Sequence, residues 1–315
     1  MKFLVTGGAG FIGSHIVERL LKEGHSVKVL DDLSSGRLEN LSFTDHGSRI
    51  TNYEFIKGDI RDEILVRKAM EGVDYVLHQA ALRSVPKSFT NPKAYNDVNI
   101  NGTLNILQTA KEANVKRVVF ASSSSVYGET DKLPEKEDLI PLLISPYALS
   151  KLAGEYYCRI FSQIYGLETV SLRYFNVFGP RQSLENEYAV VVPKFITCML
   201  KDQSPPVHGD GLQTRDFTYV KNVVQANIKA ATMPNIKCEV LNIACGSSYS
   251  VLDIVKYVNK ILKKDIKPRF EPTRPGDVKN TLADIKRAKK LIGFMPELGF
   301  EEGLRKTIEY FKKEL

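Results

Sequence analysis

The feature that most constrains the fold is a glycine-rich turn close to the start of the chain. A short apolar run, Lys2–Thr6, leads directly into the sequence GGAGFIG, residues 7–13. The stretch that follows, HIVERLLKEG, has the apolar spacing of an amphipathic helix. A glycine turn between a strand and a helix lets bare backbone approach a pyrophosphate, which rests on the helix N-terminus. The turn therefore predicts a dinucleotide site, with expected contacts from Gly7, Gly10, Phe11, Ile12 and Gly13.

Acidic residues follow the next two predicted strands. The second strand ends on Asp31, 18 residues beyond the last glycine of the turn, and Asp32 comes directly after it. A carboxylate in this place accepts the ribose hydroxyls of adenosine and repels a 2′-phosphate, so the pattern favours NAD over NADP. Asp59 follows the third predicted strand. We expect Asp59, with Ile60 beside it, to meet the edge of the adenine.

The first half of the chain alternates short β-branched runs with amphipathic stretches. The predicted strands are Lys2–Thr6, Ser26–Asp31, Tyr53–Lys57, Tyr75–His78, Arg117–Ala121 and Thr169–Arg173. Apolar strands in such a series predict an α/β fold, a Rossmann-like doubly wound parallel sheet with helices on both faces. From about Tyr174 the alternation breaks into segments rich in Pro and Gly. We expect a NAD-binding domain over residues 1–175, a return segment near 217–245, and a smaller α/β substrate-binding lobe over 176–315.

Composition excludes several classes of protein and partner. The 315 residues include 44 Lys+Arg and 37 Asp+Glu, a net charge of 44 − 37 = +7, and 43% are hydrophobic, which excludes disorder, collagen and disulfide scaffolds. Charged residues interrupt every apolar run before the roughly 18 residues of a membrane span. Basic and acidic residues are interleaved, so we expect no nucleic acid partner and no membrane partner. The four cysteines and five histidines lack metal-ligand spacing, so we expect no metal, no disulfide and a cytoplasmic protein.

A second motif carries acid–base chemistry. The sequence YALSK places Tyr147 and Lys151 four residues apart at the start of a predicted helix, where they share one face. Tyrosine has an ordinary pKa of about 10. A neighbouring ammonium and a cationic nicotinamide ring would both lower this pKa and make the phenolate a usable proton acceptor. Serines at 122–125 end the fifth predicted strand, where ligands bind in such sheets, and one of their hydroxyls can bridge the tyrosine and the reacting oxygen.

With these motifs in the expected order, the chain resembles the extended short-chain dehydrogenases/reductases over nearly its whole length. Within them it resembles the nucleotide-sugar epimerase/dehydratase family, and most of all the UDP-hexose 4-epimerases. The resemblance implies that Ser123 is the catalytic serine, that Tyr147 is the acid/base and that Lys151 orients the tyrosine and the cofactor. It also implies further cofactor contacts from Ala80, Ala81, Arg83, Asn99 and Tyr174. For Asn99, an amide that only satisfies the core is an equally good interpretation.

The same resemblance implies a nucleotide-sugar site in the second lobe. The sequence LRYFNVFGPR, residues 172–181, is specific to the family. Its Tyr174 and Phe175 are expected on the nicotinamide side, and its Asn176 is expected to donate to the diphosphate. Arg215 and Arg274 each lie in a family motif. Because guanidinium binds phosphate oxygens in pairs, these two arginines fit a diphosphate clamp.

One position bears on the choice of sugar. In the resembling hexose epimerases, the residue seven beyond the arginine of Arg-Pro-Gly-Asp borders the sugar pocket, and a tyrosine there excludes a 2-N-acetyl group. In this chain that residue is Thr281, which is small enough to admit an acetamide without overpacking. Alternatively, Thr281 only pairs a short strand, since β-branched residues favour strands.

The expected activity is NAD-dependent 4-epimerisation of a UDP-sugar through a transient 4-keto sugar. The expected pairs are UDP-N-acetylglucosamine with UDP-N-acetylgalactosamine, and UDP-glucose with UDP-galactose. A homodimer is expected on helices near 101–113 and 146–165. UDP-glucuronate 4-epimerases share a similar serine strand and remain an alternative. Resembling dehydratases and decarboxylases carry an acid at the strand end, which this chain lacks. An NAD-sensing binding protein would keep the glycines and lose Tyr147, Lys151 or the serine.

Overall fold

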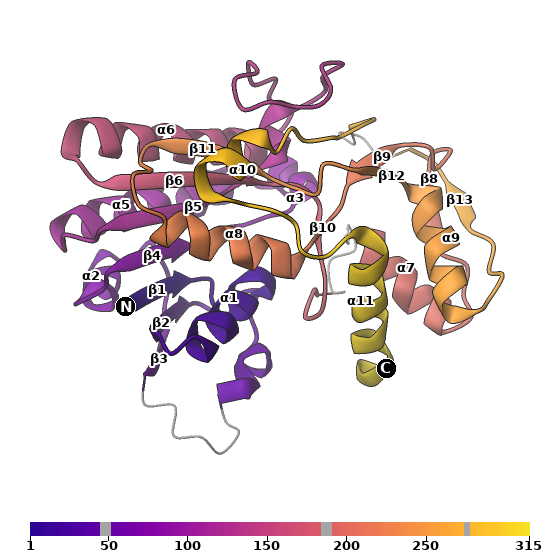
Figure 1. The fold of residues 1–315 in the computed structure, drawn as a ribbon, viewed down its shortest axis with the longest axis horizontal. Helices are drawn as coiled ribbons and strands as arrows, with labels where there is room; N and C mark the ends of the chain where they lie inside the picture. The colour runs from indigo at the N-terminus through magenta and orange to yellow at the C-terminus, as the bar shows by residue number, and fades with distance from the viewer. Residues whose placement is uncertain (45–51, 184–190, 274–277) are drawn as a thin grey trace.

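The computed structural model describes residues 1–44, 52–183, 191–273 and 278–315. At its centre lies a seven-stranded sheet with the order β11-β6-β5-β4-β1-β2-β3, in which every neighbouring pair is parallel (Figure 1). The strands are β1 (Lys2–Thr6), β2 (Ser26–Asp31), β3 (Tyr53–Lys57), β4 (Tyr75–His78), β5 (Arg117–Ser123), β6 (Glu168–Tyr174) and β11 (Glu239–Ile243). The predicted doubly wound parallel sheet is confirmed. Each strand expected from the sequence agrees with the observed one to within about two residues at either end.

Helices cover both faces of the sheet because its central strands are apolar on both sides. In β1, Phe3 and Val5 pack into one cluster, and Leu4 between them packs into another on the opposite face. The helices on the first face are α1 (Phe11–Lys22), α8 (Val220–Thr232) and α10 (Lys286–Ile292). Those on the second face are α2 (Glu63–Met70), α5 (Gly102–Glu112) and α6 (Pro146–Tyr165).

The sheet is completed by elements from the second half of the chain. Strand β11 pairs in parallel with β6, and helix α8 packs against α1. Because all seven strands are parallel, their carboxyl ends lie along one edge of the sheet. The glycine turn after β1, Ser123 at the end of β5 and Tyr174 at the end of β6 therefore lie along this edge, where ligands bind in open α/β sheets.

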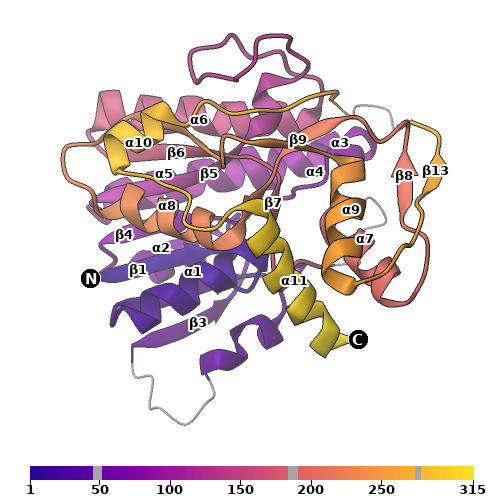
Figure 2. The same ribbon diagram turned by 45° about the vertical axis from the view of Figure 1, so that its right-hand side comes forward.

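Beside the carboxyl edge lies a smaller lobe (Figure 2). Its helices α7 (Val191–Leu200), α9 (Val251–Leu262) and α11 (Phe300–Glu314) share an apolar cluster with Phe178 and Phe217. Short strand pairs join it: β7 (Val177–Phe178) with β10 (Thr218–Tyr219), β8 (Pro206–His208) with β13 (Arg269–Glu271), and β9 (Thr214–Asp216) with β12 (Ser248–Ser250). Between β4 and α5 run the short helices α3 (Val85–Thr90) and α4 (Pro92–Tyr95) and a π-helical turn, Asn96–Asn101.

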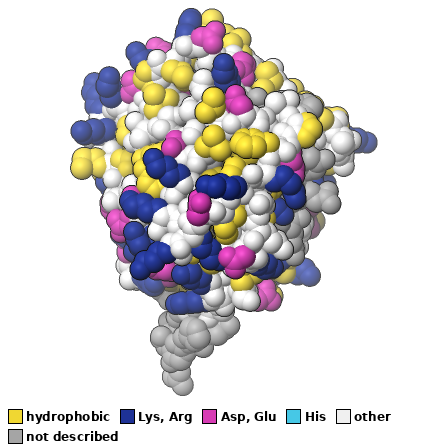
Figure 3. Space-filling view, turned by 90° about the vertical axis from the view of Figure 1, so that its right-hand side faces the viewer, with side chains coloured by type: hydrophobic (Ala, Val, Ile, Leu, Met, Phe, Trp, Pro, Cys, Tyr) yellow, Lys and Arg dark blue, Asp and Glu magenta, His cyan; other side chains and the backbone are white. Residues whose placement is uncertain are grey.

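The surface of the described residues carries mixed charge. On the face of the smaller lobe, basic side chains are spread among acidic and apolar ones (Figure 3). Several of them form ion pairs, such as Lys260 with Glu301 and Lys264 with Asp202. Within the described ranges, no helix has both the length and the apolar composition to cross a bilayer. Nor do the His, Cys, Asp and Glu side chains of these ranges form a group of three that could hold a metal ion.

Helix α6 lies close to β5 because Gly154 has no side chain. A Cβ at this position would lie 2.3 Å from Cζ of the buried Phe120 ring. We predict that Gly154→Ala lowers the free energy of unfolding by about 1 kcal/mol, since overpacking costs about 1–3 kcal/mol and the better helix propensity of alanine offsets about 1 kcal/mol. Denaturant unfolding measures the change. The control is Gly154→Ala in a Phe120→Leu background, which lacks the Cζ atom that the new Cβ would meet; an equal loss in both backgrounds would contradict the packing argument.

Candidate active site

The glycine turn forms one wall of a cavity, which we call the glycine-turn cavity. Packing within the protein explains two of the glycines: Gly7 has a φ of 67°, and a Cβ at Gly13 would lie 2.1 Å from the carbonyl oxygen of Gly7. Gly10 borders the cavity, and no side chain caps the first turn of α1. Backbone N–H groups at this helix terminus are therefore available to an anion. The arrangement fits the pyrophosphate of a dinucleotide.

The cavity gathers nearly all of the cofactor contacts expected from the sequence. The expected residues that line it are Gly7, Gly10, Phe11, Ile12, Gly13, Asp31, Asp32, Asp59, Ile60, Ala80, Ala81, Arg83, Tyr147, Lys151 and Tyr174. Ser34, Ser35, Gln79 and Leu82 line it as well, and the sequence analysis did not single them out. Gln79 could have been found, because it stands beside Ala80 after β4. Tyr174 donates to its side-chain oxygen over 3.1 Å.

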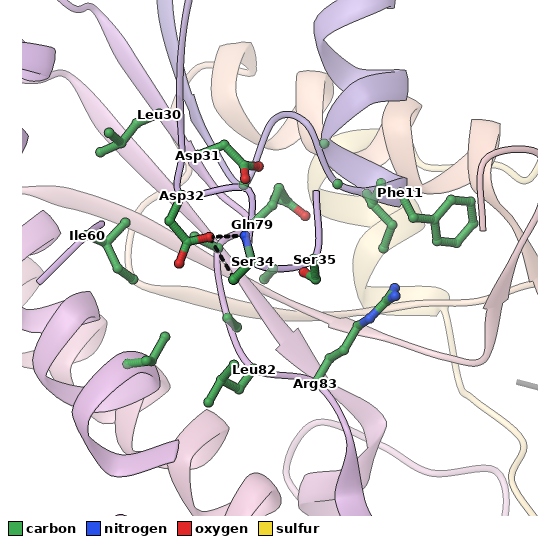
Figure 4. Close-up of a pocket in the computed structure, with 18 of the residues that line it drawn as sticks. Phe11, Leu30, Asp31, Asp32, Ser34, Ser35, Ile60, Gln79, Leu82 and Arg83 are labelled. Carbon is green, nitrogen blue, oxygen red and sulfur yellow. Dashed lines mark hydrogen bonds between the residues drawn. The ribbon is translucent and has the colours of Figure 1, made fainter. Parts of the chain in front are cut away.

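The two acids after β2 differ in their surroundings. Asp31 is buried and accepts hydrogen bonds from the backbone N–H groups of Ala9 and Leu33, both at 2.9 Å. Burial raises the pKa of Asp31, and these bonds lower it. Asp32 is exposed and accepts from the backbone N–H and the hydroxyl of Ser34, at 2.9 and 2.7 Å (Figure 4). Asp31 thus holds the glycine turn to the end of β2, and its predicted ribose contact, like that of Asp32, stays a prediction.

Asp59 lies on the same cavity with its carboxylate already paired. The guanidinium of Arg61 binds it at 2.6 Å, and this hydrogen bond lowers the pKa of Asp59. A contact between Asp59 and adenine would therefore share the carboxylate with Arg61.

Asn99 is the expected cofactor contact that does not line the cavity. It is buried, its side-chain oxygen accepts from the N–H of Leu82 at 2.8 Å, and its amide donates to the Leu82 carbonyl at 2.9 Å and to Ser150 at 2.9 Å. The hydroxyl of Tyr95 binds both backbone groups of Ser84 in the same way, at 3.0 and 2.6 Å. Asn99 and Tyr95 therefore fix the loop on either side of Arg83, so Asn99 acts on the cavity through Leu82.

The three expected catalytic residues come together at the start of α6. Ser145 caps this helix, accepting from the N–H of Ala148 at 3.1 Å, and Tyr147 follows in its first turn. Ser123 faces Tyr147 and lowers the pKa of its phenol. Lys151, one turn further, is buried; its Nζ donates to the carbonyl of Ala121 at 2.7 Å and lies 5.9 Å from the centre of the Tyr147 ring.

The electrostatics around Tyr147 differ from the expectation in one respect. Burial raises the pKa of Tyr147, whereas Ser123 and the positive charge of Arg83 lower it. Lys151 donates one of its N–H groups to the Ala121 carbonyl, and burial lowers the pKa of its own ammonium to about 8. The structure thus adds Ser123 and Arg83 to the groups that lower the pKa of Tyr147, and a contribution of Lys151 stays a prediction.

A buried ion pair beneath α6 was not expected from the sequence. Arg173 of β6 binds both carboxylate oxygens of Glu155 on α6, at 2.9 and 2.7 Å, and both side chains are buried. The hydroxyl of Ser122, at the end of β5, donates to the same carboxylate. The pair thus ties α6 to the strand ends that carry the site. No local pattern marks it, because the partners of Glu155 lie 18 and 33 residues away.

A second cavity of about 480 Å³ opens between the carboxyl edge of the sheet and the smaller lobe, and we call it the lobe cavity. Its volume lies in the range of about 300–1,000 Å³ that is usual for small-molecule sites. The expected substrate residues that line it are Ser123, Tyr147, Asn176, Arg215 and Thr281. Six residues line both cavities: Phe11, Ile12, Arg83, Ser122, Tyr147 and Tyr174. The two cavities therefore meet at Tyr147.

Thr281 both lines the lobe cavity and pairs with a short strand, the two roles that the sequence left open. Its side chain lines the lobe cavity, and its backbone N–H donates to the Thr214 carbonyl of β9 at 3.1 Å. Its hydroxyl accepts from the amide of Asn176 and from the N–H of Asp216, both at 3.2 Å. Arg215 donates to the Thr214 carbonyl at 2.8 Å. The lobe residues of the site are thus linked to one another through β9.

Phe175 was expected near the ligands and is not found there. Phe175 is fully buried in a cluster with Tyr127 and Ala244 and lines neither cavity, which contradicts the expected nicotinamide contact. Residues that follow one another in extended backbone point to opposite sides, so Phe175 turns into the core where Tyr174 turns to the cavities. Arg274 lies outside the described residues, and its place in a diphosphate clamp stays a prediction.

Known proteins are similar to this chain over nearly its whole length. Over 314 residues, it is 41% identical to a putative UDP-glucose 4-epimerase of Methanocaldococcus jannaschii, with 98% of each chain covered. A solved UDP-N-acetylglucosamine 4-epimerase from Methanobrevibacter ruminantium M1, in complex with UDP-N-acetylmuramic acid, is 43% identical, with a TM-score of 0.94 and coverage of 100% and 99%. A UDP-glucuronic acid 4-epimerase from Bacillus cereus, in complex with UDP-glucuronic acid and NAD, is 34% identical, with a TM-score of 0.92 and full coverage of both chains.

The family is shown by the chain itself as well as by these relatives. Residues 3–244 match the profile of the NAD dependent epimerase/dehydratase family. This match spans the glycine turn, the serine strand, α6 and the return of the chain through α8 and β11. The chain therefore belongs to the NAD-dependent epimerase/dehydratase family of nucleotide-sugar enzymes, and its cofactor is NAD.

Proposed function

We propose that the protein is a 4-epimerase of UDP-hexoses. It interconverts UDP-N-acetylglucosamine and UDP-N-acetylgalactosamine, and UDP-glucose and UDP-galactose. The observation that carries this proposal is the lining of the lobe cavity: it meets Tyr147 and Ser123, and no Asp or Glu of the described residues lines it. A dehydration or decarboxylation of the kind that uses an acid at the strand end has no such acid here. A redox-neutral epimerisation needs none.

In the proposed mechanism, bound NAD supplies a hydride acceptor that later returns the hydride. Tyr147 takes the proton of the sugar 4-hydroxyl, and Ser123 bridges the phenol and the reacting oxygen. Lys151 holds the helix turn below them through the Ala121 carbonyl. Asn176 and Arg215 bind the diphosphate from the lobe, together with Arg274, while the 4-keto sugar turns to present its other face. Tyr147 then returns the proton to the 4-oxygen, and the configuration at C4 is inverted.

The walls of the lobe cavity suit this rotation of the 4-keto sugar. Between the polar groups, the cavity is lined by apolar side chains, including Val85, Ile144, Val191 and Phe195. Apolar walls make few directional contacts with sugar hydroxyls, so a sugar anchored by its diphosphate can rotate there. The division into a NAD-binding domain over 1–175, with 217–245 returning to it, and a substrate lobe over 176–315 belongs to the same proposal.

We further propose a cytoplasmic homodimer. Helix α6 exposes Leu149, Tyr156, Ile160 and Ile164, which recur at helical spacing on one face. Four-helix contact through α5 and α6 of two copies would cover this face. The cytoplasmic location is supported by the four cysteines, all of which are free, as is usual in a reducing compartment.

We predict that Tyr147→Phe lowers kcat by at least about a hundredfold while leaving nucleotide-sugar affinity nearly unchanged, because it removes the proton acceptor and keeps the ring. Since burial raises the pKa of Tyr147, kcat of the wild type will increase as the pH rises. Steady-state kinetics and calorimetric titration measure both effects. Tyr165→Phe, on the exposed end of the same helix, is the control. Near-normal turnover of Tyr147→Phe would exclude the assigned acid/base.

The sugar preference is tested at Thr281. We expect the wild type to epimerise both the N-acetylated and the plain pair, and Thr281→Tyr to lose the N-acetylated reaction by at least about a hundredfold through steric overlap. Thr281→Val keeps the size and loses the hydroxyl that Asn176 and Asp216 bind. It will therefore affect both pairs alike. Chromatography of the products resolves the outcomes; turnover of UDP-glucuronate alone would favour the UDP-glucuronate 4-epimerase alternative.

The dimer is tested on the exposed face of α6. Ile160→Asp places a charge in the proposed interface, and we predict a shift from dimer to monomer by light scattering because an unpaired charge cannot be buried there. Ile64→Asp on α2, at an exposed isoleucine away from this face, is the matched control. A wild type that is monomeric at micromolar concentration would disprove the dimer.

A further inference from the structure

Two carboxyl groups lie buried beneath the lobe cavity, and the mechanism above uses neither. Glu135 is 1% exposed and Asp216 is fully buried. Glu135 belongs to the loop between β5 and α6, and Asp216 ends β9. Both contact residues 281–284, a segment whose first residue, Thr281, lines the cavity.

Asp216 binds this segment as an ionised carboxylate. One of its oxygens accepts from the N–H of Cys245 at 2.9 Å, and the other accepts from Gly246 at 2.9 Å and Ala283 at 3.3 Å. All three partners are donors, so the ionised form gains all three bonds. Burial raises the pKa of Asp216 to about 7, and these hydrogen bonds lower it. Its carbonyl meanwhile accepts from the Asn176 amide at 3.2 Å, and its N–H donates to the Thr281 hydroxyl at 3.2 Å. Asp216 thus connects two residues of the lobe cavity to the segments behind them.

Glu135 binds the same segment through its backbone alone. Its N–H donates to the Leu282 carbonyl at 2.7 Å, and its carbonyl accepts from Asp284 at 2.8 Å. The oxygen Oε2 of its side chain is buried and has no hydrogen-bond partner within the described ranges. An ionised carboxylate with an unpartnered oxygen is costly to bury, which favours the neutral acid.

The charges around Glu135 agree with a neutral acid. Burial is the largest effect and raises the pKa of Glu135 to about 8, and the negative charge of Asp216 raises it further, while Arg215 and Arg173 lower it. Arg173 is already paired with Glu155. Two further carboxyls belong to the surroundings. Asp284 touches Glu135 through its backbone, and Glu137 accepts from the N–H of Asn242 at 2.8 Å.

We propose that Glu135 and Asp216 form a pair carrying a single negative charge, which positions Asn176 and Thr281 on the lobe cavity. Asp216 holds residues 281–284 by its charge, and Glu135 can pack beside it only while it keeps its proton. Both are positioning residues, since neither lines the cavity. The role in substrate binding rests on the proposed function, whereas the charge state of the pair does not.

The charge state is tested by thermal unfolding of Glu135→Gln, which has the shape of the neutral acid. Between the unfolded pKa of about 4.3 and the folded pKa of about 8, only the unfolded wild type releases the proton. Its stability therefore falls as the pH rises through this window and levels off above it. The melting temperature of Glu135→Gln minus that of the wild type will rise between pH 5 and 8 and stay constant above. A difference that does not depend on pH would overturn the proposal, and Asp138→Asn, at an exposed carboxyl of the same loop, is the control.

The positioning role is tested by kinetics of the intact, NAD-loaded enzyme. In the wild type, KM for the UDP-sugar will rise above pH 8 as Glu135 ionises beside Asp216, and in Glu135→Gln it will not. The pH profile of kcat will be the same in both, because Tyr147 is untouched. A rise of KM in both proteins, or a shifted kcat profile in the variant, would overturn the role.

Asp216→Asn provides the complementary measurement. The variant replaces the carboxylate, which accepts charge-assisted hydrogen bonds, by a neutral amide. We expect KM to increase at least about tenfold with kcat changed much less. NAD affinity and circular dichroism show whether this variant is folded; if it is not, the kinetics of Glu135→Gln decide. An unchanged KM in folded Asp216→Asn would overturn the role. If no UDP-sugar is turned over at all, the proposed function fails, while the unfolding experiment still decides the charge state.

Discussion

The docking of α6 on the ends of β5 and β6 is the contact on which the site depends. Its register is fixed by the buried pair of Glu155 and Arg173, and its distance from the sheet is fixed by Gly154 against Phe120. Burying two charges costs desolvation, which well-packed apolar residues would avoid. The pair instead fixes the orientation of α6 on the sheet, because two hydrogen bonds at fixed angles allow one placement of the helix. Tyr147, two turns before Glu155, is placed by that constraint.

Local patterns in the sequence were sufficient for six of the seven strands of the sheet, all but β11, and for the first cavity. The strands are continuous apolar runs because they are covered on both faces, and such runs are visible without knowledge of their partners. The glycine turn is equally local, because a Cβ on Gly13 would overlap the backbone of Gly7, which is close by in the chain. The parallel topology then brings strand ends together without further information, so Ser123, Tyr147 and the turn could be placed at one edge from the sequence.

The remaining features depend on contacts between distant segments, which no spacing rule predicts. The ammonium of Lys151 donates to the Ala121 carbonyl, 30 residues away, a contact that no spacing along the chain predicts. Arg83, whose charge lowers the pKa of Tyr147, lies on a loop that Asn99 and Tyr95 fix. Asp216 was not predicted for a related reason: the N–H groups that bind its carboxylate come from two later segments, Cys245 with Gly246 and Ala283.

The polar groups of the lobe cavity belong to two networks, and this arrangement suits the epimerisation that we propose. Tyr147 and Ser123 come from the sheet domain, where α6 docks on β5. Asn176 and Thr281 are joined to each other and to β9, independently of α6. In the proposed reaction, the lobe network holds the ligand while Tyr147 and Ser123 meet the reacting oxygen. Because apolar residues also line the cavity, rotation of the sugar breaks few hydrogen bonds with the protein. The same two polar networks can therefore serve both faces of the sugar.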